Sequence, residues 1–262
     1  MIKNQVRMNQ AKPFRFLQIS DLHLHPDENY TYNERLPLLS FKAVLADIQA
    51  LNPKPDFLLF SGDIASDKQE EVYLSVDQMI QATGFPYYWI GGNHDDPELM
   101  ARLADRLDVH SVPHFIHQQW HFILLDSVAK DRKGSYGEFS KKDLKNLARA
   151  LEGYPDLPSL LVMHHHFLPT GFPWMDNSTL KDAETFLKLV NKFPQVKAIL
   201  HGHIHQDKYT NLGGIQIWAC PSTAYQFKPQ AEFALDDIAP GYRIFDLEPN
   251  GSIRSEVRRV TI

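Results

Sequence analysis

The chain has 262 residues, of which 43% are hydrophobic and 23% charged, the composition of an ordinary globular protein. Its 27 Lys and Arg against 32 Asp and Glu give a net charge of −5, so no general attraction to nucleic acid is expected. The single cysteine, Cys220, excludes an internal disulfide framework and suits a reducing compartment, and no apolar stretch approaches the roughly 20 residues that span a bilayer. We expect a cytoplasmic protein with no membrane partner.

The first half of the chain alternates between strand-like and helix-like segments. Short apolar runs predict strands, and apolar residues at helical spacing predict helices. After a polar arm at residues 1–13, we expect strands at 14–20, 56–60 and 87–90, each followed by a helix: 36–50, 69–82 and a third from Pro97 to about Leu107.

The second half continues this alternation before it ends in consecutive strands. We expect strands at 120–126, 159–163 and 196–200, a helix at 141–151 capped by Ser140, and a helix that Ser178 caps and that reaches Lys192. Three further runs, 215–219, 242–247 and 252–260, predict antiparallel strands that form a second sheet packed on the first. The pattern predicts one α/β domain over residues 14–262.

Polar motifs follow five of these predicted strands. In open α/β sheets, ligands bind in the crevice beyond the carboxyl ends of the strands. We therefore expect the motif side chains to meet in one place. In chain order they are Asp21 and His23, Asp63, Asn93 and His94, His164, and His203 and His205.

These side chains offer too many donors for one ion. A structural zinc site usually has four ligands with thiolates prominent, whereas nitrogen and oxygen donors without sulfur suit divalent Mn, Fe or Zn. Two ions need a bridging carboxylate, and Asp63 suits this role because Gly62 lets the backbone turn close to them. Two such ions, about 3.5–4 Å apart, clamp the oxygens of a displacement at phosphorus and make hydroxide available near neutral pH.

The motifs Asp-Leu-His, Gly-Asp, Gly-Asn-His-Asp, a single His after a strand, and Gly-His-Ile-His resemble, in that order, those of the calcineurin-like metallophosphoesterases. The resemblance implies a four-layer αββα sandwich of two mixed β-sheets flanked by helices. It implies a first metal position held by Asp21, His23, Asp63 and His205, and a second held by Asp63, Asn93, His164 and His203. It leaves His94 uncoordinated, as the catalytic residue that contacts the phosphate and protonates the leaving oxygen.

Within this family, the chain looks most like the class III bacterial 3′,5′-cyclic-AMP phosphodiesterases. The similar stretches are 163–166, 174–180, 192–194, 202–206, 221–223, 226–229 and 235–242. The resemblance implies a small cyclic nucleotide as substrate, contacted by His23, Asn93, His94 and His205, and its hydrolysis to 5′-AMP by a hydroxide that bridges two divalent ions. Phe167 departs from the pattern, because a Pro is usual at that position.

Other functions are compatible with the same residues. A broad-specificity phosphodiesterase, a lipid-linked pyrophosphate hydrolase and a nuclease would share the two-metal site. The chain shows no amphipathic basic segment for a lipid surface, and 262 residues with a net charge of −5 leave little room for the extra domains or basic groove of a nuclease. A binding scaffold without turnover should have lost ligands, whereas every motif residue is present here.

The remaining histidines and two aspartates have several interpretations. Successive side chains on an extended segment point to opposite faces, so we assign only His164 of residues 164–166 as a ligand. His165 and His166 are expected beside the site or on the surface, and His201 as structural or exposed. The histidines at 110, 114, 117 and 121 are interpreted as four unrelated residues. Either Asp67 or Asp95 could orient His94, or both are simply caps or surface carboxylates.

The loop at 171–177 carries two large aromatic residues, Phe172 and Trp174, among turn residues. Such side chains are difficult to bury in a loop, so we interpret them as a wall beside the metals. Trp174 is the candidate for stacking on a purine. The aromatic residues of 85–89 are expected in the core instead, and the oligomeric state is left open.

Overall fold

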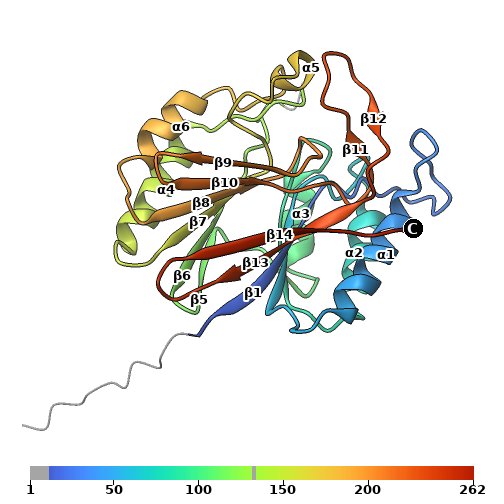
Figure 1. Cartoon of the computed structure of the whole chain (residues 1–262), viewed down its shortest axis with the longest axis horizontal. Helices are drawn as coiled ribbons and strands as arrows, with labels where there is room; N and C mark the ends of the chain where they lie inside the picture. The colour runs from blue at the N-terminus through green and yellow to red at the C-terminus, as the bar shows by residue number, and fades with distance from the viewer. Residues whose placement is uncertain (1–11, 132–133) are drawn as a thin grey trace, which may run out of the picture.

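Two stacked six-stranded β-sheets form the centre of the computed structural model, which describes residues 12–131 and 134–262 (Figure 1). The first sheet has the order β14-β13-β1-β2-β3-β4, and the second β5-β6-β7-β8-β10-β9. The first consists of β1 (Phe14–Ile19), β2 (Phe57–Ser61), β3 (Tyr87–Ile90), β4 (Val109–His110), β13 (Gly241–Leu247) and β14 (Ile253–Arg259). The second consists of β5 (His114–His117), β6 (Trp120–Leu124), β7 (Ser159–Val162), β8 (Val196–His201), β9 (Lys208–Leu212) and β10 (Ile215–Ala219). A separate two-stranded sheet pairs β11 (Gln226–Phe227) with β12 (Leu235–Asp236).

Helices cover the outer face of each sheet. The first sheet packs against α1 (Pro37–Ala50), α2 (Glu70–Gln81) and α3 (Pro97–Ala104). The second packs against α4 (Lys141–Gly153) and α6 (Ala183–Val190), and the short α5 (Pro173–Asp176) lies in the predicted aromatic loop. This order of layers is the αββα sandwich that the sequence motifs imply.

Strand β2 shows why its sequence is an almost continuous apolar run. Phe57 and Leu59 face the second sheet, and Leu58 and Phe60 face the helices. Because side chains alternate along a strand, a strand that is buried on both faces must be apolar at nearly every position. The central strands are therefore fixed between two cores, and their carboxyl ends are held in place.

The strands that carry the motifs run parallel within each sheet. β1 pairs with β2 and β2 with β3 in the first sheet, and β7 pairs with β8 in the second, all in parallel. Their carboxyl ends therefore meet at one edge of the sandwich, as predicted.

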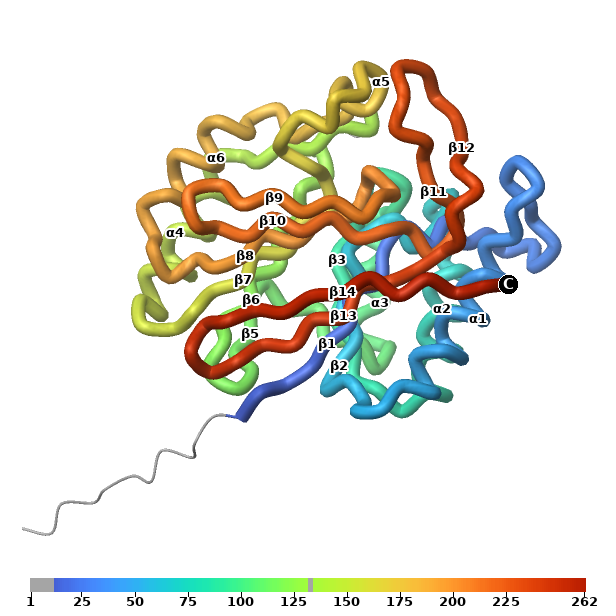
Figure 2. Tube along the Cα trace, in the orientation of Figure 1, coloured from blue at the N-terminus to red at the C-terminus, as the bar shows by residue number. Residues whose placement is uncertain are grey.

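The prediction for the last strands was partly wrong. β10 joins the second sheet parallel to β8, whereas β13 and β14 run beside β1 and extend the first sheet, as the trace in Figure 2 shows. The second sheet already begins at β5 and β6. An apolar run indicates a strand but does not indicate which strand it pairs with.

Some helix ends also differ from the predictions. Ser140 caps α4 through a capping box with Asp143, as predicted. Ser178 is not a cap: its hydroxyl bonds to that of Ser135, and α6 begins later, after Asp182. The third helix ends at Ala104 rather than near Leu107.

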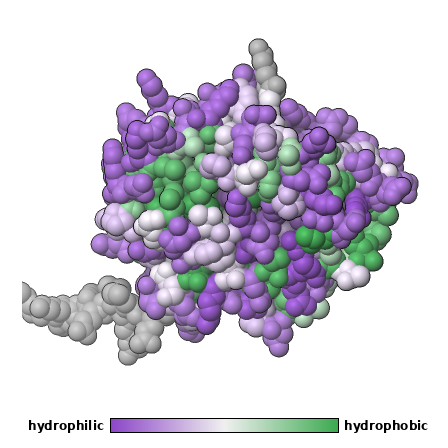
Figure 3. Space-filling model, turned by 45° about the horizontal axis from the view of Figure 1, so that its top comes forward, coloured by the Kyte–Doolittle hydropathy of each residue, from purple (hydrophilic) through white to green (hydrophobic). Residues whose placement is uncertain are grey.

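Most of the predicted polar arm, residues 1–11, lies outside the described residues. Within residues 12–131 and 134–262, no helix is long and apolar enough to cross a membrane. Hydrophilic side chains cover most of the face in Figure 3, where the apolar surface is divided into separate patches.

Candidate metal centre

The structure brings the predicted ligands together where the two sheets meet. Three overlapping groups each place one donor atom per residue within 4.8 Å of the others. They are Asp21, His23 and His205; His23, Asp63 and His94; and Asp63, His164 and His203. The residues come from the loops after β1, β2, β3, β7 and β8, so all five predicted strand ends contribute to one cluster.

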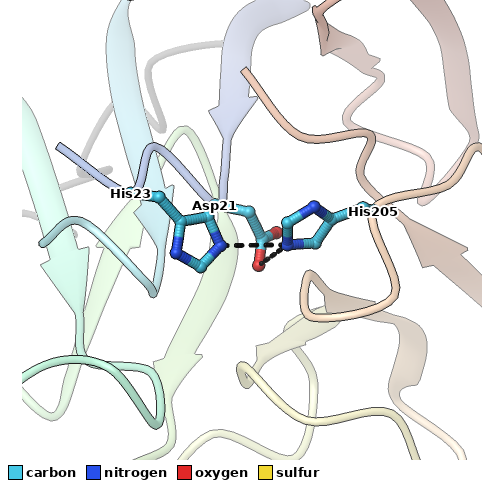
Figure 4. A group of neighbouring side chains, drawn as sticks. All are labelled: Asp21, His23 and His205. Atoms are coloured by element: carbon cyan, nitrogen blue, oxygen red, sulfur yellow. Dashed lines mark hydrogen bonds and ion pairs between the residues drawn. The ribbon is translucent and has the colours of Figure 1, made fainter. Parts of the chain in front are cut away.

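Asp21, His23 and His205 form the first half of this cluster (Figure 4). The Nε2 atoms of His23 and His205 lie 3.0 Å apart, and His205 Nε2 lies 3.3 Å from Asp21 Oδ1. The other nitrogen of His205, Nδ1, donates to the carbonyl of Tyr225 at 2.7 Å. This bond leaves the Nε2 lone pair directed at the cluster, as it is in metal-binding histidines.

His164 is oriented in the same way in the second half. Its Nδ1 donates to the carbonyl of Ser61 at 2.8 Å, so the Nε2 lone pair faces the cluster. Nε2 lies 3.2 Å from Asn93 Oδ1 and 3.4 Å from Asp63 Oδ2. Three acceptors thus converge on one small volume, an arrangement that requires a proton or a cation between them.

Asp63 lies between the two halves. Its Oδ2 is 3.4 Å from His164 Nε2 and 3.7 Å from His23 Nε2, and its Oδ1 accepts the backbone N–H of His94 at 2.9 Å. The preceding Gly62 has a φ of 100°, and a Cβ there would lie 2.4 Å from His164 Nδ1. The chain can bring Asp63 this close to His164 only with glycine at position 62.

Five candidate ligands have left-handed backbone conformations. Their φ values lie between 47° and 69°, a region that few residues other than Gly adopt, although Asn, Asp and His enter it more often than the rest; they are Asp21, His23, Asp63, His203 and His205. Strain of this kind costs about 1–3 kcal/mol per residue and is concentrated at functional sites. Here it directs side chains from the ends of straight strands into one cluster.

The electrostatics of the cluster favour bound positive charge. Asp21 and Asp63 are 0% and 2% exposed, and no Lys or Arg forms an ion pair with either among the described residues. Burial lowers the pKa of His23 to about 3, so its imidazole is a neutral donor. Burial also opposes the charged form of His164, but the carboxylates of Asp63 and Asp21 and the carbonyl of Ser61 together outweigh it and raise the pKa of His164 to about 9. Buried carboxylates need a nearby positive charge, and divalent cations that bind nitrogen and oxygen ligands can provide it here.

Asn93 and His94 lie at the rim of the cluster, where Asn93 is half-buried and His94 is exposed. His94 Nδ1 lies 3.1 Å from the carbonyl of Ser66, which orients the ring. Neither predicted aspartate has this role. Asp95 instead accepts hydrogen bonds from backbone N–H groups and a tyrosine, and Asp67 contacts Gln69.

The other histidines of the two motifs are buried around the cluster. His165 and His166 are 0% and 1% exposed, so neither lies on the surface, and His165 Nδ1 bonds to the hydroxyl of Ser127 at 2.8 Å. His201 is buried, and its Nδ1 contacts the adjacent Gly202 carbonyl. None of the three belongs to the groups of possible metal ligands.

The distant histidines are not all unrelated, contrary to the sequence interpretation. His114 and His121 face each other across β5 and β6, with Nδ1 and Nε2 3.1 Å apart. They lie on strands rather than on a helix, which agrees with the presence of Pro113, a residue that disfavours a helix interior.

Trp174 lies beside the cluster, with the ring of Phe227 between it and the candidate ligand His205. Its indole N–H donates to the carbonyl of Gln230, and its ring packs edge-on against Phe227 and Phe233, each with centroids 5.2 Å away. Phe227 in turn stacks on His205 with centroids 3.9 Å apart. Aromatic side chains therefore form a wall beside the cluster, and this wall includes Phe227 and Phe233 as well as Trp174 of the loop at 171–177.

Sequence reasoning missed several groups that support the cluster. The carbonyls of Ser61, Ser66 and Tyr225 orient histidines, and the Tyr225 ring packs beside His23 with centroids 5.2 Å apart. A backbone carbonyl has no sequence signature, so no motif could have identified them.

Comparison with known proteins agrees with the fold and the cluster. Residues 14–207, more than half of the chain, match the calcineurin-like phosphoesterase family. The chain belongs to this family of metal-dependent phosphoesterases. The family and the donor set together point to a dinuclear site for divalent metal ions.

Among curated proteins, several relatives are similar over nearly their whole length. A 3′,5′-cyclic adenosine monophosphate phosphodiesterase, CpdA, from Haemophilus influenzae is 36% identical over 99% of this chain and 95% of its own. CpdA from Escherichia coli K12 is also 36% identical, over 94% and 90%. A 3′,5′-cyclic-nucleotide phosphodiesterase from Nostoc is 32% identical over 97% and 95%.

Solved structures share the fold at low sequence identity. A dimetal phosphatase from Danio rerio has a TM-score of 0.63 at 14% identity, covering 95% of this chain and 99% of its own. GAP50, described as the anchor in the inner membrane complex of Plasmodium, has a TM-score of 0.65 at 14% identity, covering 96% and 89%. Because proteins so differently described share this fold, function must be argued from the site.

Proposed function

We propose that this chain is a dinuclear metal phosphodiesterase that hydrolyses 3′,5′-cyclic AMP to 5′-AMP. The observation that carries the proposal is the position of Asp63, whose Oδ2 lies between His164 Nε2 at 3.4 Å and His23 Nε2 at 3.7 Å. A carboxylate that lies between the imidazole nitrogens of two groups of candidate ligands is suited to bridge two cations. The names of the relatives that cover almost the whole chain support cyclic AMP as the substrate.

Each chain holds two divalent ions, Fe, Mn or Zn, in this proposal. When bound, such ions lower the pKa of a coordinated water toward neutrality and offset the negative charge of phosphate oxygens. The first is held by Asp21, His23, Asp63 and His205, and the second by Asp63, Asn93, His164 and His203.

Hydrolysis joins a water oxygen to phosphorus and breaks the bond between phosphorus and the 3′ oxygen, which then needs a proton. His94 is suited to supply it, because Ser66 holds its Nδ1 and the exposed ring borders both His23 and Asp63. His23, Asn93, His94 and His205 are the proposed contacts of the phosphate group.

Trp174→Ala is expected to raise KM for cyclic AMP and to leave bis-p-nitrophenyl phosphate, which has no purine, almost unchanged. Stacking of a base on an aromatic side chain is worth about 1–3 kcal/mol, so kcat/KM for cyclic AMP should fall about 5- to 150-fold. Steady-state kinetics with both substrates test this. Trp174→Phe is the matched control, because it keeps a ring against Phe227 and should retain most of the activity. An equal loss on both substrates would instead assign Trp174 to supporting the β11–β12 hairpin.

A substrate panel tests the function itself. The purified protein is assayed under Mn(II) and Fe(II) with cyclic AMP, cyclic GMP, 2′,3′-cyclic nucleotides, bis-p-nitrophenyl phosphate and a phosphomonoester. We expect the highest kcat/KM for cyclic AMP among the natural substrates. Preference for a 2′,3′-cyclic nucleotide, or equal cleavage of all diesters, would favour a broad-specificity phosphodiesterase or a nuclease.

We also propose a cytoplasmic location and no nucleic-acid partner. Cys220 is free and buried, which suits a reducing compartment, and the net charge is −5. Residues 14–262 are proposed to act as one domain.

A further inference from the structure

The loops after β2 and β3 are joined by one buried side chain, that of Asp95. It is 1% exposed and accepts four hydrogen bonds. Its Oδ2 accepts the N–H groups of Gly92 at 2.8 Å and Ile64 at 3.1 Å. Its Oδ1 accepts the N–H of Ala65 and the hydroxyl of Tyr73, each at 3.0 Å. The donors come from both loops and from helix α2.

The two loops carry the residues at the centre of the proposed metal site. Ile64 directly follows Asp63, and Gly92 directly precedes Asn93. The loops fit closely: a Cβ on Gly92 would lie 2.2 Å from Asp63 Oδ1, and the same oxygen accepts the N–H of His94 at 2.9 Å. A small shift of one loop against the other would therefore move Asp63 relative to Asn93.

Tyr73 anchors this arrangement to the body of the protein. Its side chain is completely buried on α2 and packs edge-on against Trp89 of β3, with ring centroids 5.9 Å apart. Its hydroxyl donates to Asp95 and accepts the N–H of Asp96 at 3.1 Å, immediately before α3 begins. One hydroxyl thus fixes both the acceptor that joins the loops and the turn that leads into α3.

We infer that Tyr73 and Asp95 are positioning residues that set the spacing between Asp63 and Asn93 for binding of the two metal ions. Neither side chain is a proposed ligand. Groups that orient metal ligands typically change metal affinity or activity 10- to 100-fold when they are removed. This inference rests on the metal ligands of the proposed function but not on the identity of its substrate.

Tyr73→Phe tests the inference, with Tyr87→Phe as the matched control. Tyr87 is also buried beside α2, and its hydroxyl donates to the carboxylate of Asp77 at 2.6 Å, so each variant removes one hydroxyl from one buried aspartate. Mn(II) dissociation constants are measured on metal-free protein by electron paramagnetic resonance of free Mn(II), and thermal midpoints are recorded alongside. We expect Tyr73→Phe to weaken Mn(II) binding about tenfold, and Tyr87→Phe to bind as the wild type does.

Asp95→Asn is an independent arm of the same experiment. Asparagine replaces one carboxylate oxygen with an NH₂ group, which would face two of the four hydrogen-bond donors that now point at Asp95. Mn(II) binding should therefore weaken at least as much as in Tyr73→Phe. The inference is overturned if Tyr73→Phe and Tyr87→Phe change Mn(II) affinity equally, or if folded Asp95→Asn binds Mn(II) as the wild type does. Failure of the wild type to bind two ions would instead contradict the proposed function.

Discussion

Asp63→Ala is expected to abolish hydrolysis of every phosphodiester and to remove more metal than any other single ligand substitution. Asp63 is the only proposed ligand shared by both positions, and its Oδ2 faces His23 on one side and His164 on the other. Without this carboxylate, two cations a few ångströms apart would repel each other with no anion between them. Metal analysis of the purified variant, together with its activity, measures the effect.

Asp77→Ala is the control for the loss of a buried carboxylate. Asp77 is 6% exposed on α2, where it accepts hydrogen bonds from Tyr87 and Gln81, and it lies outside the metal cluster. This variant should be less stable than the wild type and still bind two ions. If Asp63→Ala retained two ions per chain, the bridging role would be wrong.

His94→Ala is expected to keep both metals and lose about 10²- to 10⁴-fold in kcat on cyclic AMP, the usual range for a positioned proton donor. The loss should be much smaller with bis-p-nitrophenyl phosphate, because p-nitrophenolate leaves with little need of protonation. Kinetics on both substrates, with metal analysis of the same preparation, provide the comparison.

His110→Ala is a suitable control for this substitution. His110 is an exposed histidine on β4 of the same sheet, outside the metal cluster, and its loss should leave the rate unchanged. An equal loss on both substrates in His94→Ala would leave the residue with phosphate binding alone and remove its role as proton donor. Loss of a metal ion would make it a ligand, a role that its position near His23 and Asp63 permits.

The sequence predicted the parts of the fold that depend on local pattern. The apolar strand predicted at 56–60 and the Gly62-Asp63 turn after β2 have strong local signals, because a strand buried on both faces and a turn beside a crowded site admit few residue types. The convergence of five motifs also followed, since parallel strands end at the same edge of a sheet.

The missed features depend on contacts between distant segments. Nothing local distinguishes a strand that joins β8 from one that joins β1, and so β10 and β13 were assigned to the same sheet. The acceptor for His94 is the carbonyl of Ser66, a group that every residue carries. The short strands β11 and β12, two residues each, pair with each other. The hairpin that they form brings Phe233 against the ring of Trp174, a contact between segments far apart in the sequence.

Titration of metal-free protein with Mn(II), followed by the rate of cyclic AMP hydrolysis, tests directly whether the chain is a two-metal cyclic AMP phosphodiesterase. We expect a rate that rises to a plateau at two equivalents of Mn(II) per chain, with 5′-AMP as the product. A plateau at one equivalent, 3′-AMP as the product, or no hydrolysis of cyclic AMP at any Mn(II) concentration while bis-p-nitrophenyl phosphate is cleaved would contradict it.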